Sequence, residues 1–399
     1  MAKHGLRKGL KFVKRKLTNK PIAGLPAWVN THTTHARRQP VYDPPGSEAY
    51  TGQTVMIIGA MGALGRRTAY LFVLNGAACI HLTGKCRDEL AKLEYDLRND
   101  HHLHTANPGC RFILHELDLS NRGMTRDFVK RITTDCPHLH VLLFNAATFC
   151  PGFQGCDGPD DASEATERMM QVNCYSQCLI FMALRKILSD TGRDSGSLSH
   201  VTFVTCHWLG NGYGTQLPDS VSNLRARLAN RITFNSGHQF HLSKLLTTFW
   251  VYYYASLAPV DETHVVVNTV WPGTLKHSNI YREWGPEVHQ ATEEARALFG
   301  RPIGRAARVV HAATRGNAGT HGHCIANKTK YLGQNLVTQH ARLGCERLVY
   351  RMIEQVMRRE ITTINDQMDS TEFQMVLDTP HDSDEDEPVV DNPWQPTLG

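Results

Sequence analysis

The sequence predicts a doubly wound α/β fold, in which a mainly parallel β-sheet lies between two layers of helices. Short β-branched runs alternate with longer amphipathic runs from residue 51 to about residue 315. The strand runs are apolar at consecutive positions, as in Val141, Leu142, Leu143 and Phe144, so both faces of each strand should be buried. Strands of this kind, alternating with helices, are typical of three-layer architectures.

The individual elements follow from these runs. Six strands are expected, at 54–58, 78–82, 111–115, 140–145, 200–205 and 264–270. Six helices are expected between and after them, at 64–75, 87–98, 122–135, 163–188, 237–256 and 303–314. A last helix is expected at about 337–359, because apolar residues recur there at helical spacing.

The two ends of the chain differ from this core in charge. Residues 1–42 carry ten Lys/Arg and no acid, and residues 360–399 carry eleven Asp/Glu and no Lys/Arg. Uniformly charged segments with few apolar residues do not bury enough surface to fold. We therefore divide the chain into a basic, proline-containing arm and linker at 1–50, an α/β domain at 51–359, and an acidic, disordered tail at 360–399.

The composition favours a soluble, cytoplasmic protein. The chain is 41% hydrophobic and 20% charged, and no apolar run approaches the roughly 18 residues that span a bilayer. The N-terminus lacks the apolar core of a secretory signal. Eleven cysteines include no CxxC pair, which favours free thiols in a reducing compartment, and we expect no metal site.

The basic arm leaves several roles open. Leu6, Leu10, Val13 and Leu17 recur at helical spacing among lysines and arginines. This pattern is typical of an amphipathic anchor on an anionic membrane surface or of a mitochondrial presequence, and a solvated basic arm is the simpler interpretation. A nucleic-acid-binding role depends on charge alone, because aromatic residues are not interleaved with the cations, and we do not favour it.

A glycine-rich turn follows the first expected strand. Gly59, Gly62 and Gly65 stand at three-residue spacing just before the first helix. Glycines here permit a tight turn and the approach of a pyrophosphate, which the helix N-terminus then binds through its free N–H groups. The motif alone is weak, but its place at the first strand–helix junction predicts a Rossmann-type fold that binds a nicotinamide dinucleotide.

The choice of cofactor depends on residues after the second strand. Lys85 and Arg87 precede the first acid, Asp88, where a site for NAD usually places an acid. Arg66 also follows the glycine turn closely. These cations favour the 2′-phosphate of NADP, with NAD as the alternative if they are ordinary charges at a helix start.

Further residues occur in the order found in short-chain dehydrogenases/reductases. They are Asp118, Asn145 followed by Ala146 and Ala147, Asn173, and Pro272 with Gly273. Residues 51–315 thus resemble that family as an ordered set, although each group alone is weak. The resemblance implies that Asp118 contacts the adenine and that Asn145, Pro272 and Gly273 border the cofactor. It also implies that Asn173 holds a proton-relay water.

One branch of the family resembles the chain in more detail. Residues 139–149 and 278–284 are similar to those of family members that carry WW modules ahead of the reductase domain, and retinol dehydrogenase-like reductases are the next nearest. Only residues 25–28 and 42–45 are reminiscent of a WW module, and 29–41 lack its middle aromatic residue. We therefore expect no working binder of proline motifs at the N-terminus.

The expected catalytic groups are incomplete. Members of the family protonate a carbonyl oxygen with a tyrosine that lies four residues before a lysine, on the same helix face. Here Lys244 is present, but Phe240 stands at the tyrosine position. Cys206, a weaker donor, stands where the resemblance places an orienting serine. General acid–base catalysis is worth about 10²–10⁴ in rate, so this loss is large.

Two functions remain in competition. The leading hypothesis is a dinucleotide-binding protein with hydride transfer lost or much weakened and with a regulatory or protein-partner-binding role. The alternative is an active NADP-dependent carbonyl or alcohol oxidoreductase with a displaced proton donor. His207, Tyr213 and, less favourably placed on its helix, His241 are the candidates for that donor. Asn173 and Lys244 agree with both hypotheses, whereas Phe240 and Cys206 favour the first.

Overall fold

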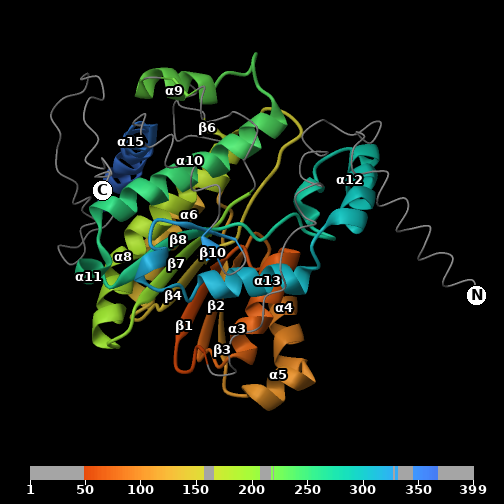
Figure 1. Ribbon diagram of the computed structural model, residues 1–399, viewed down its shortest axis with the longest axis vertical. Coiled ribbons are helices and arrows are strands. Elements are labelled where there is room, and N and C mark those ends of the chain that lie inside the picture. Colours follow the sequence, from red (N-terminus) through yellow and green to blue (C-terminus); the bar gives the residue numbers. More distant parts are fainter. Residues whose placement is uncertain are drawn as a thin grey trace, which may run out of the picture.

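The computed structural model describes residues 49–156, 166–206, 217–218, 220–326, 329–330 and 345–366. At its centre is an eight-stranded sheet in the order β10-β9-β8-β7-β4-β1-β2-β3 (Figure 1). The strands are β1 (Thr54–Ile58), β2 (Cys79–Gly84), β3 (Arg111–Glu116), β4 (Val141–Phe144), β7 (Ser199–Val204), β8 (Val265–Val270), β9 (Cys324–Ala326) and β10 (Thr329–Lys330). Every neighbouring pair is parallel except β9 with β10. Strand order reverses beside β1, which confirms the doubly wound fold.

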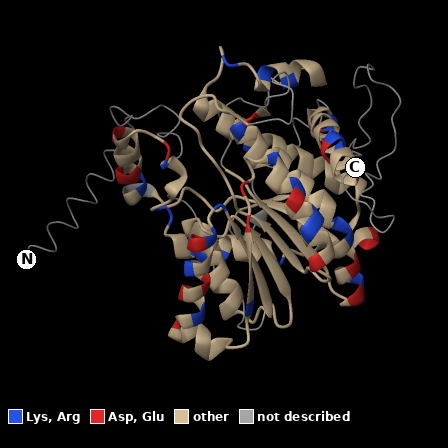
Figure 2. Cartoon of the chain, turned by 180° about the vertical axis from the view of Figure 1, so that it is seen from behind, with Lys and Arg blue, Asp and Glu red and all other residues tan. Residues whose placement is uncertain are grey.

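Two layers of helices cover the sheet because its strands are apolar on both faces. Met56 and Ile58 of β1 belong to one core cluster, and Val55 and Ile57 belong to the other. The first cluster includes side chains of α6 (Arg122–Asp135), α8 (Ser176–Asp194), α10 (Ser236–Leu257) and α15 (Cys345–Asp366). The second includes side chains of α3 (Ala63–Leu74), α4 (Arg87–Asn99), α5 (His101–Ala106) and α13 (Ile303–Ala313). Charged residues lie mainly on the helices (Figure 2).

The six predicted strands and five of the six predicted helices before residue 315 are confirmed to within two residues, the helix predicted at 163–188 ends at Asp194, and short elements were missed. β9, β10, the two-stranded sheet of β5 (Gly155–Cys156) with β6 (Thr166–Glu167), α5, α9 (Val221–Leu228), α11 (Val260–Thr263) and α12 (Pro286–Phe299) were not expected. These elements are brief or polar, so they carry little periodic signal. The long helix predicted at 163–188 begins with α7 (Arg168–Met170), passes through the π-helical turn η3 (Gln171–Tyr175) and continues as α8.

The last helix is shifted relative to its prediction. It spans Cys345–Asp366 in place of 337–359, so it enters the segment assigned to the acidic tail. Ile361 and Ile364 are buried against the core. Glu360 Oε2 lies 3.4 Å from Arg126 Nη1, and its Oε1 lies 3.7 Å from Arg122 Nε. These contacts to α6 hold the final turns on the domain, and the tail's remaining residues, 367–399, lie outside the described residues.

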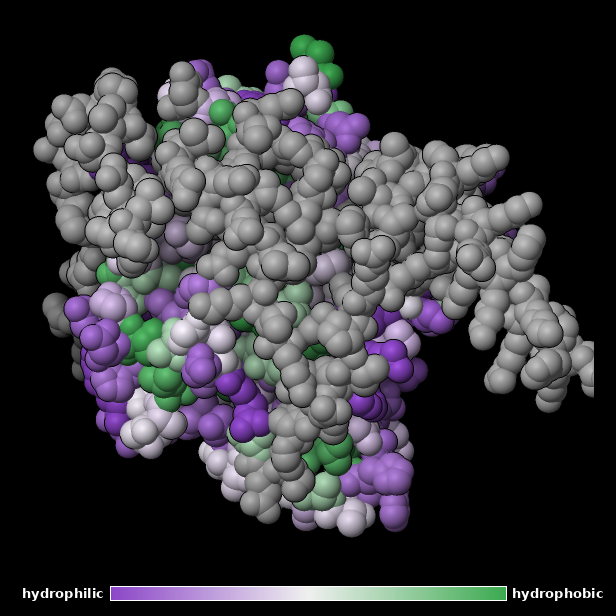
Figure 3. Space-filling model, in the orientation of Figure 1, coloured by the Kyte–Doolittle hydropathy of each residue, from purple (hydrophilic) through white to green (hydrophobic). Residues whose placement is uncertain are grey.

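The described surface is mixed in character. Figure 3 shows purple and green residues interspersed on the lower part of one face. Among the described residues the exposed large apolar side chains are scattered, at Tyr95, Ile113, Ile232 and Leu257. No helix in the described ranges combines the length and apolarity that a bilayer-spanning segment needs.

The packing of α15 generates a stability prediction. Ile353 is fully buried in the larger core cluster, so Ile353→Ala should lower the free energy of unfolding by about 2–5 kcal/mol. Gln355→Ala, on the exposed side of the same helix, should change it by less than about 0.5 kcal/mol. Urea denaturation monitored by circular dichroism measures both. Equal effects would show that α15 does not contribute to the core.

Candidate functional site

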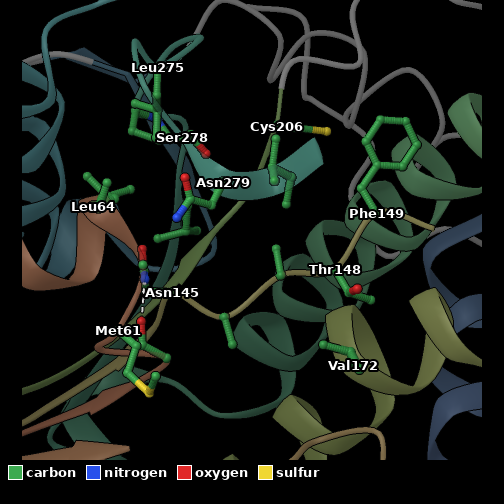
Figure 4. A pocket seen from close by; sticks show the side chains of 18 of the residues that line it. Met61, Leu64, Asn145, Thr148, Phe149, Val172, Cys206, Leu275, Ser278 and Asn279 are labelled. Atoms are coloured by element: carbon green, nitrogen blue, oxygen red, sulfur yellow. Dashed lines mark hydrogen bonds between the residues drawn. The ribbon is translucent and has the colours of Figure 1, made fainter. Parts of the chain in front are cut away.

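A cavity of about 560 Å³ lies beyond the carboxyl ends of the strands. Residues that follow β1, β2, β4, β7 and β8 all line it. In doubly wound sheets, ligands bind in this position, at the point where strand order reverses. In Figure 4, Met61, Leu64 and Asn145 lie on one side of the cavity, and Thr148, Phe149 and Val172 lie on the other.

The glycine turn is built as the sequence predicts. A Cβ atom on Gly59 would lie 2.7 Å from the Ala146 backbone, and one on Gly65 would lie 2.5 Å from the Gly59 oxygen, so neither position accepts a side chain. Gly62 faces open space, and no side chain caps the N-terminus of α3 there. The free N–H groups and the open space beside them fit the pyrophosphate of a dinucleotide.

Other expected cofactor residues border the same cavity. Asn145, Pro272 and Gly273 all line it. Asn145 Nδ2 donates to the Gly59 oxygen at 2.7 Å, which ties the end of β4 to the glycine turn. Gly273 has a φ of 86°, a conformation that glycine adopts without strain, so the turn after β8 can pass close to a ligand.

The cations near β2 are divided between two roles. Lys85 lines the cavity, and its Nζ lies 3.0 Å from Asp118 Oδ1. Burial alone would raise the pKa of Asp118, but donors from Ser120 and Lys85 outweigh that effect and lower it. Arg87 is exposed outside the cavity lining, and Arg66 pairs with Met61 O and Asp96. Lys85 is thus the basic residue of this group that faces the cavity.

Phe240 supplies a ring and no proton donor. It lines the cavity on α10, one turn before Lys244. Its ring stacks on Phe149, with centroids 4.7 Å apart and planes inclined by 28°. The structure therefore places an apolar aromatic face where the family resemblance calls for a tyrosine hydroxyl.

Lys244 is buried and already hydrogen-bonded. It is 3% exposed and lines the cavity, and its Nζ donates to the Val204 oxygen at 2.9 Å. Burial lowers the pKa of Lys244 to about 8, with the nearby thiols of Cys206 and Cys174 opposing the shift. An ammonium has three N–H donors, so two remain for a ligand.

Asn173 is held entirely by protein groups. Its Nδ2 donates to the Thr148 oxygen and to Ser243 Oγ, and its Oδ1 accepts from the Thr148 N–H. Its carbonyl oxygen accepts from Thr247 Oγ1 at 3.1 Å. The residue lies in the π-helical turn η3, a distortion that often marks functional sites.

The described side chains that could replace the tyrosine as donor are poorly suited to the task. Burial raises the pKa of the Cys206 thiol to about 12, so the thiol is neutral at pH 7. Thr205 Oγ1 bonds to Thr248 Oγ1 and to the Lys244 oxygen, on α10. His241 lines the cavity but bonds to the Gly237 oxygen, and burial lowers its pKa to about 4. His207 and Tyr213 lie outside the described residues.

Sequence reasoning missed the aromatic wall at this end of the cavity. Phe149, Phe240 and Tyr281 line the cavity, and Trp284 packs behind Phe149 at 4.9 Å between centroids. Tyr281 and Trp284 follow β8 by more than ten residues, in and after the 3-10 turn η5 (Asn279–Tyr281). Both aromatic residues of the segment 278–284 are visible in the sequence, but nothing local indicated that this segment folds over the cavity.

Arg296 of α12 was also missed. It is 4% exposed and lines the cavity, and its guanidinium lies over the Tyr281 ring at 5.4 Å. Among the described residues no group of three or more His, Cys, Asp or Glu is placed to hold a metal ion.

Comparison with known proteins identifies this architecture. A family model for short chain dehydrogenases matches residues 53–207. A short chain dehydrogenase of Hypocrea jecorina (strain QM6a) is 27% identical over 241 residues, which are 60% of this chain and 65% of that protein. The solved structure of a short chain dehydrogenase from Pseudomonas syringae superposes with a TM-score of 0.50 at 17% identity, over 72% of this chain and all of the other. These matches support assignment of the chain to the short-chain dehydrogenase/reductase family.

The similarity to members with WW modules is confirmed at low identity. The WW domain-containing oxidoreductase of Homo sapiens is 28% identical over 251 residues, which are 59% of this chain and 52% of that protein. The chain thus covers less than two thirds of the length of either relative named here. The family match supports the binding of a nicotinamide dinucleotide. That cofactor would supply the hydride, and Lys244 and the glycine turn are the residues of this chain that would hold it.

The lowered pKa of Lys244 makes cofactor binding depend on pH. The ammonium donates hydrogen bonds below its pKa of about 8 and loses a donor and its charge as the pH rises through that value. The dissociation constant for NADP should therefore increase about tenfold between about pH 7 and pH 9.5, by titration calorimetry. Lys244→Met should flatten this dependence, whereas Lys85→Ala should retain it. A profile unchanged by Lys244→Met would assign the titration to another group.

Proposed function

We propose that this protein binds a nicotinamide dinucleotide but transfers hydride poorly, and that it acts as a regulatory or partner-binding member of its family. The observation that carries the proposal is the Phe240 ring, which lies one helical turn before Lys244 and offers no proton to a carbonyl oxygen. The glycine turn, Asn145 and Lys244 support retained cofactor binding.

A second function is favoured by one specific feature. Tyr281 lines the cavity and its ring centroid lies 5.4 Å from that of Phe149, so it brings a phenol to the substrate end. In an active reductase, Tyr281 would be the displaced proton donor. Burial raises the pKa of Tyr281, with the Arg296 guanidinium opposing the shift, so the phenol stays protonated at neutral pH but is a weaker acid than an exposed tyrosine.

The free cysteines and the basic arm support proposals about the location and the partners of the protein. All eleven cysteines are free thiols, which supports a cytoplasmic location. The basic arm at 1–50, of which residues 1–48 lie outside the described residues, keeps a membrane-peripheral or mitochondrial location open. An anionic membrane surface or an acidic protein would complement its charge.

Restoring the missing hydroxyl tests the main proposal. Wild-type protein should reduce carbonyl compounds slowly or not at all with NADPH, and Phe240→Tyr should raise the rate at least about tenfold. The full 10²–10⁴ of general acid catalysis is not expected, because Cys206 still replaces the orienting serine. Adding Cys206→Ser should raise the rate further and non-additively. NADPH absorbance, followed with steroid, retinoid and aliphatic carbonyls, gives the rates.

A matched control is Phe234→Tyr, which adds a phenol to the same hydrophobic cluster outside the cavity lining. It should leave the rate unchanged. Robust wild-type turnover that Phe240→Tyr does not alter, but that Tyr281→Phe abolishes, would replace the main proposal by the active reductase.

We propose that NADP binds more tightly than NAD, because Lys85 faces the cavity and can meet a 2′-phosphate. Asp118 competes with the 2′-phosphate for the Lys85 ammonium. The preference for NADP over NAD should therefore be near tenfold in the dissociation constant, or about 1.4 kcal/mol. Lys85→Ala should remove it in calorimetric titrations of both cofactors. Arg87→Ala should leave it intact, because that side chain lies outside the cavity lining. Equal wild-type affinities would contradict the proposal.

A further inference from the structure

The substrate end of the cavity is enclosed by rings. Phe149 is in ring contact with Phe240 at 4.7 Å, with Trp284 at 4.9 Å and with Tyr281 at 5.4 Å between centroids. Phe149 and Tyr281 are almost completely buried, and Phe240 is half-buried. Three of these four residues line the cavity directly, so its wall at this end is a continuous aromatic surface.

The aromatic wall is fixed from behind by polar contacts. Trp284 Nε1 donates to the Phe149 oxygen at 3.0 Å. Arg168 forms a two-point ion pair with the neighbouring Glu283, with N–O distances of 3.0 and 3.1 Å. Arg296 donates from Nε to the Leu275 oxygen and from Nη1 to the Ser278 oxygen. These bonds hold the segment after β8 over the cavity, so the rings are positioned before a ligand arrives.

Phe240 has a free surface to offer. Phe149 stacks against one face of its ring, and Phe240 nevertheless lines the cavity, so part of the ring is exposed to the cavity. Aromatic rings attract other rings in offset-stacked or edge-to-face arrangements beyond the effect of buried area. A preformed aromatic surface of this kind recognises ligands at a low cost in ordering.

We propose that the aromatic wall binds a flat, apolar ring compound by stacking, and that Phe240 is its main ring contact. Phe240, which has no hydroxyl group to donate a proton, would then serve to recognise the ligand. The inference rests on the proposed function in one respect, since it places the ring compound beside a dinucleotide bound in the same cavity. A saturated compound of the same size gains the apolar burial but not the stacking, and so should bind more weakly.

The experiment compares two probes on the full-length protein with saturating NADP⁺, the oxidised cofactor, which cannot reduce either ketone. Titration calorimetry with 2-acetonaphthone, an aromatic ketone, should give binding at least about tenfold tighter than its decahydro analogue, which has the same skeleton without the flat rings. Phe240→Leu, which keeps apolar volume but removes the flat ring, should weaken naphthyl binding about tenfold and narrow the difference between the probes. Phe240→Tyr should bind it within threefold of wild type.

Controls separate folding, cofactor binding and ring recognition. Phe234→Leu makes the same change in the same cluster but outside the cavity lining, and should leave naphthyl binding intact. Thermal unfolding with NADPH reports the cofactor site independently. A thermal shift without naphthyl binding overturns the inference alone, whereas naphthyl binding without a thermal shift overturns the proposed function alone. Equal affinity for the two probes, or a Phe240→Leu protein that is stable and binds normally, also overturns the inference.

Discussion

The close approach of Gly59 to Ala146 is the constraint on which the cavity depends. A Cβ atom on Gly59 would lie 2.7 Å from the Ala146 backbone, so a side chain there would push the glycine turn away from the segment that leaves β4. The Asn145 amide then locks this contact by bonding to the Gly59 oxygen. The same contact positions the N-terminus of α3 and the start of the 145–149 segment. It therefore helps to shape the cavity both beside the glycine turn and beside Phe149.

The buried ammonium of Lys244 lies one helical turn after Phe240, which occupies the position where the family resemblance places a tyrosine. A buried ammonium is costly unless hydrogen-bonded, and here the Val204 oxygen provides the bond. The remaining cost appears as a pKa lowered to about 8. A tyrosine at position 240 would give the ammonium a phenol to polarise, and the ring of Phe240 does not. Under the proposed function, the lysine would keep a role in binding the cofactor without an acid to activate at position 240.

The sequence predicted the sheet, the glycine turn and the spacing of Phe240 and Lys244 because these depend on local periodicity or on positions one helical turn apart. It missed Tyr281 and Arg296 because they reach the cavity through the packing of η5 and α12, across large sequence separations. The end of α15 was placed seven residues too early. Acidic residues after 359 resemble a solvated tail, and only the pairing of Glu360 with α6 shows that the helix continues.

Retention of a family residue is not in itself evidence of catalysis in this chain. Asn173 binds the Thr148 backbone twice, Ser243 through its side chain and Thr247 through its carbonyl oxygen. It therefore joins η3, α10 and the segment after β4, and an apolar residue in its place would leave the N–H and the carbonyl oxygen of Thr148 without these partners in the core. Such buried groups cost about 1–3 kcal/mol each when unsatisfied. The structural hydrogen bonds of Asn173 are therefore enough to explain why this residue is present. The ring of Phe240, in contrast, packs without needing a hydroxyl group, so Asn173 can be present in a chain that lacks the tyrosine.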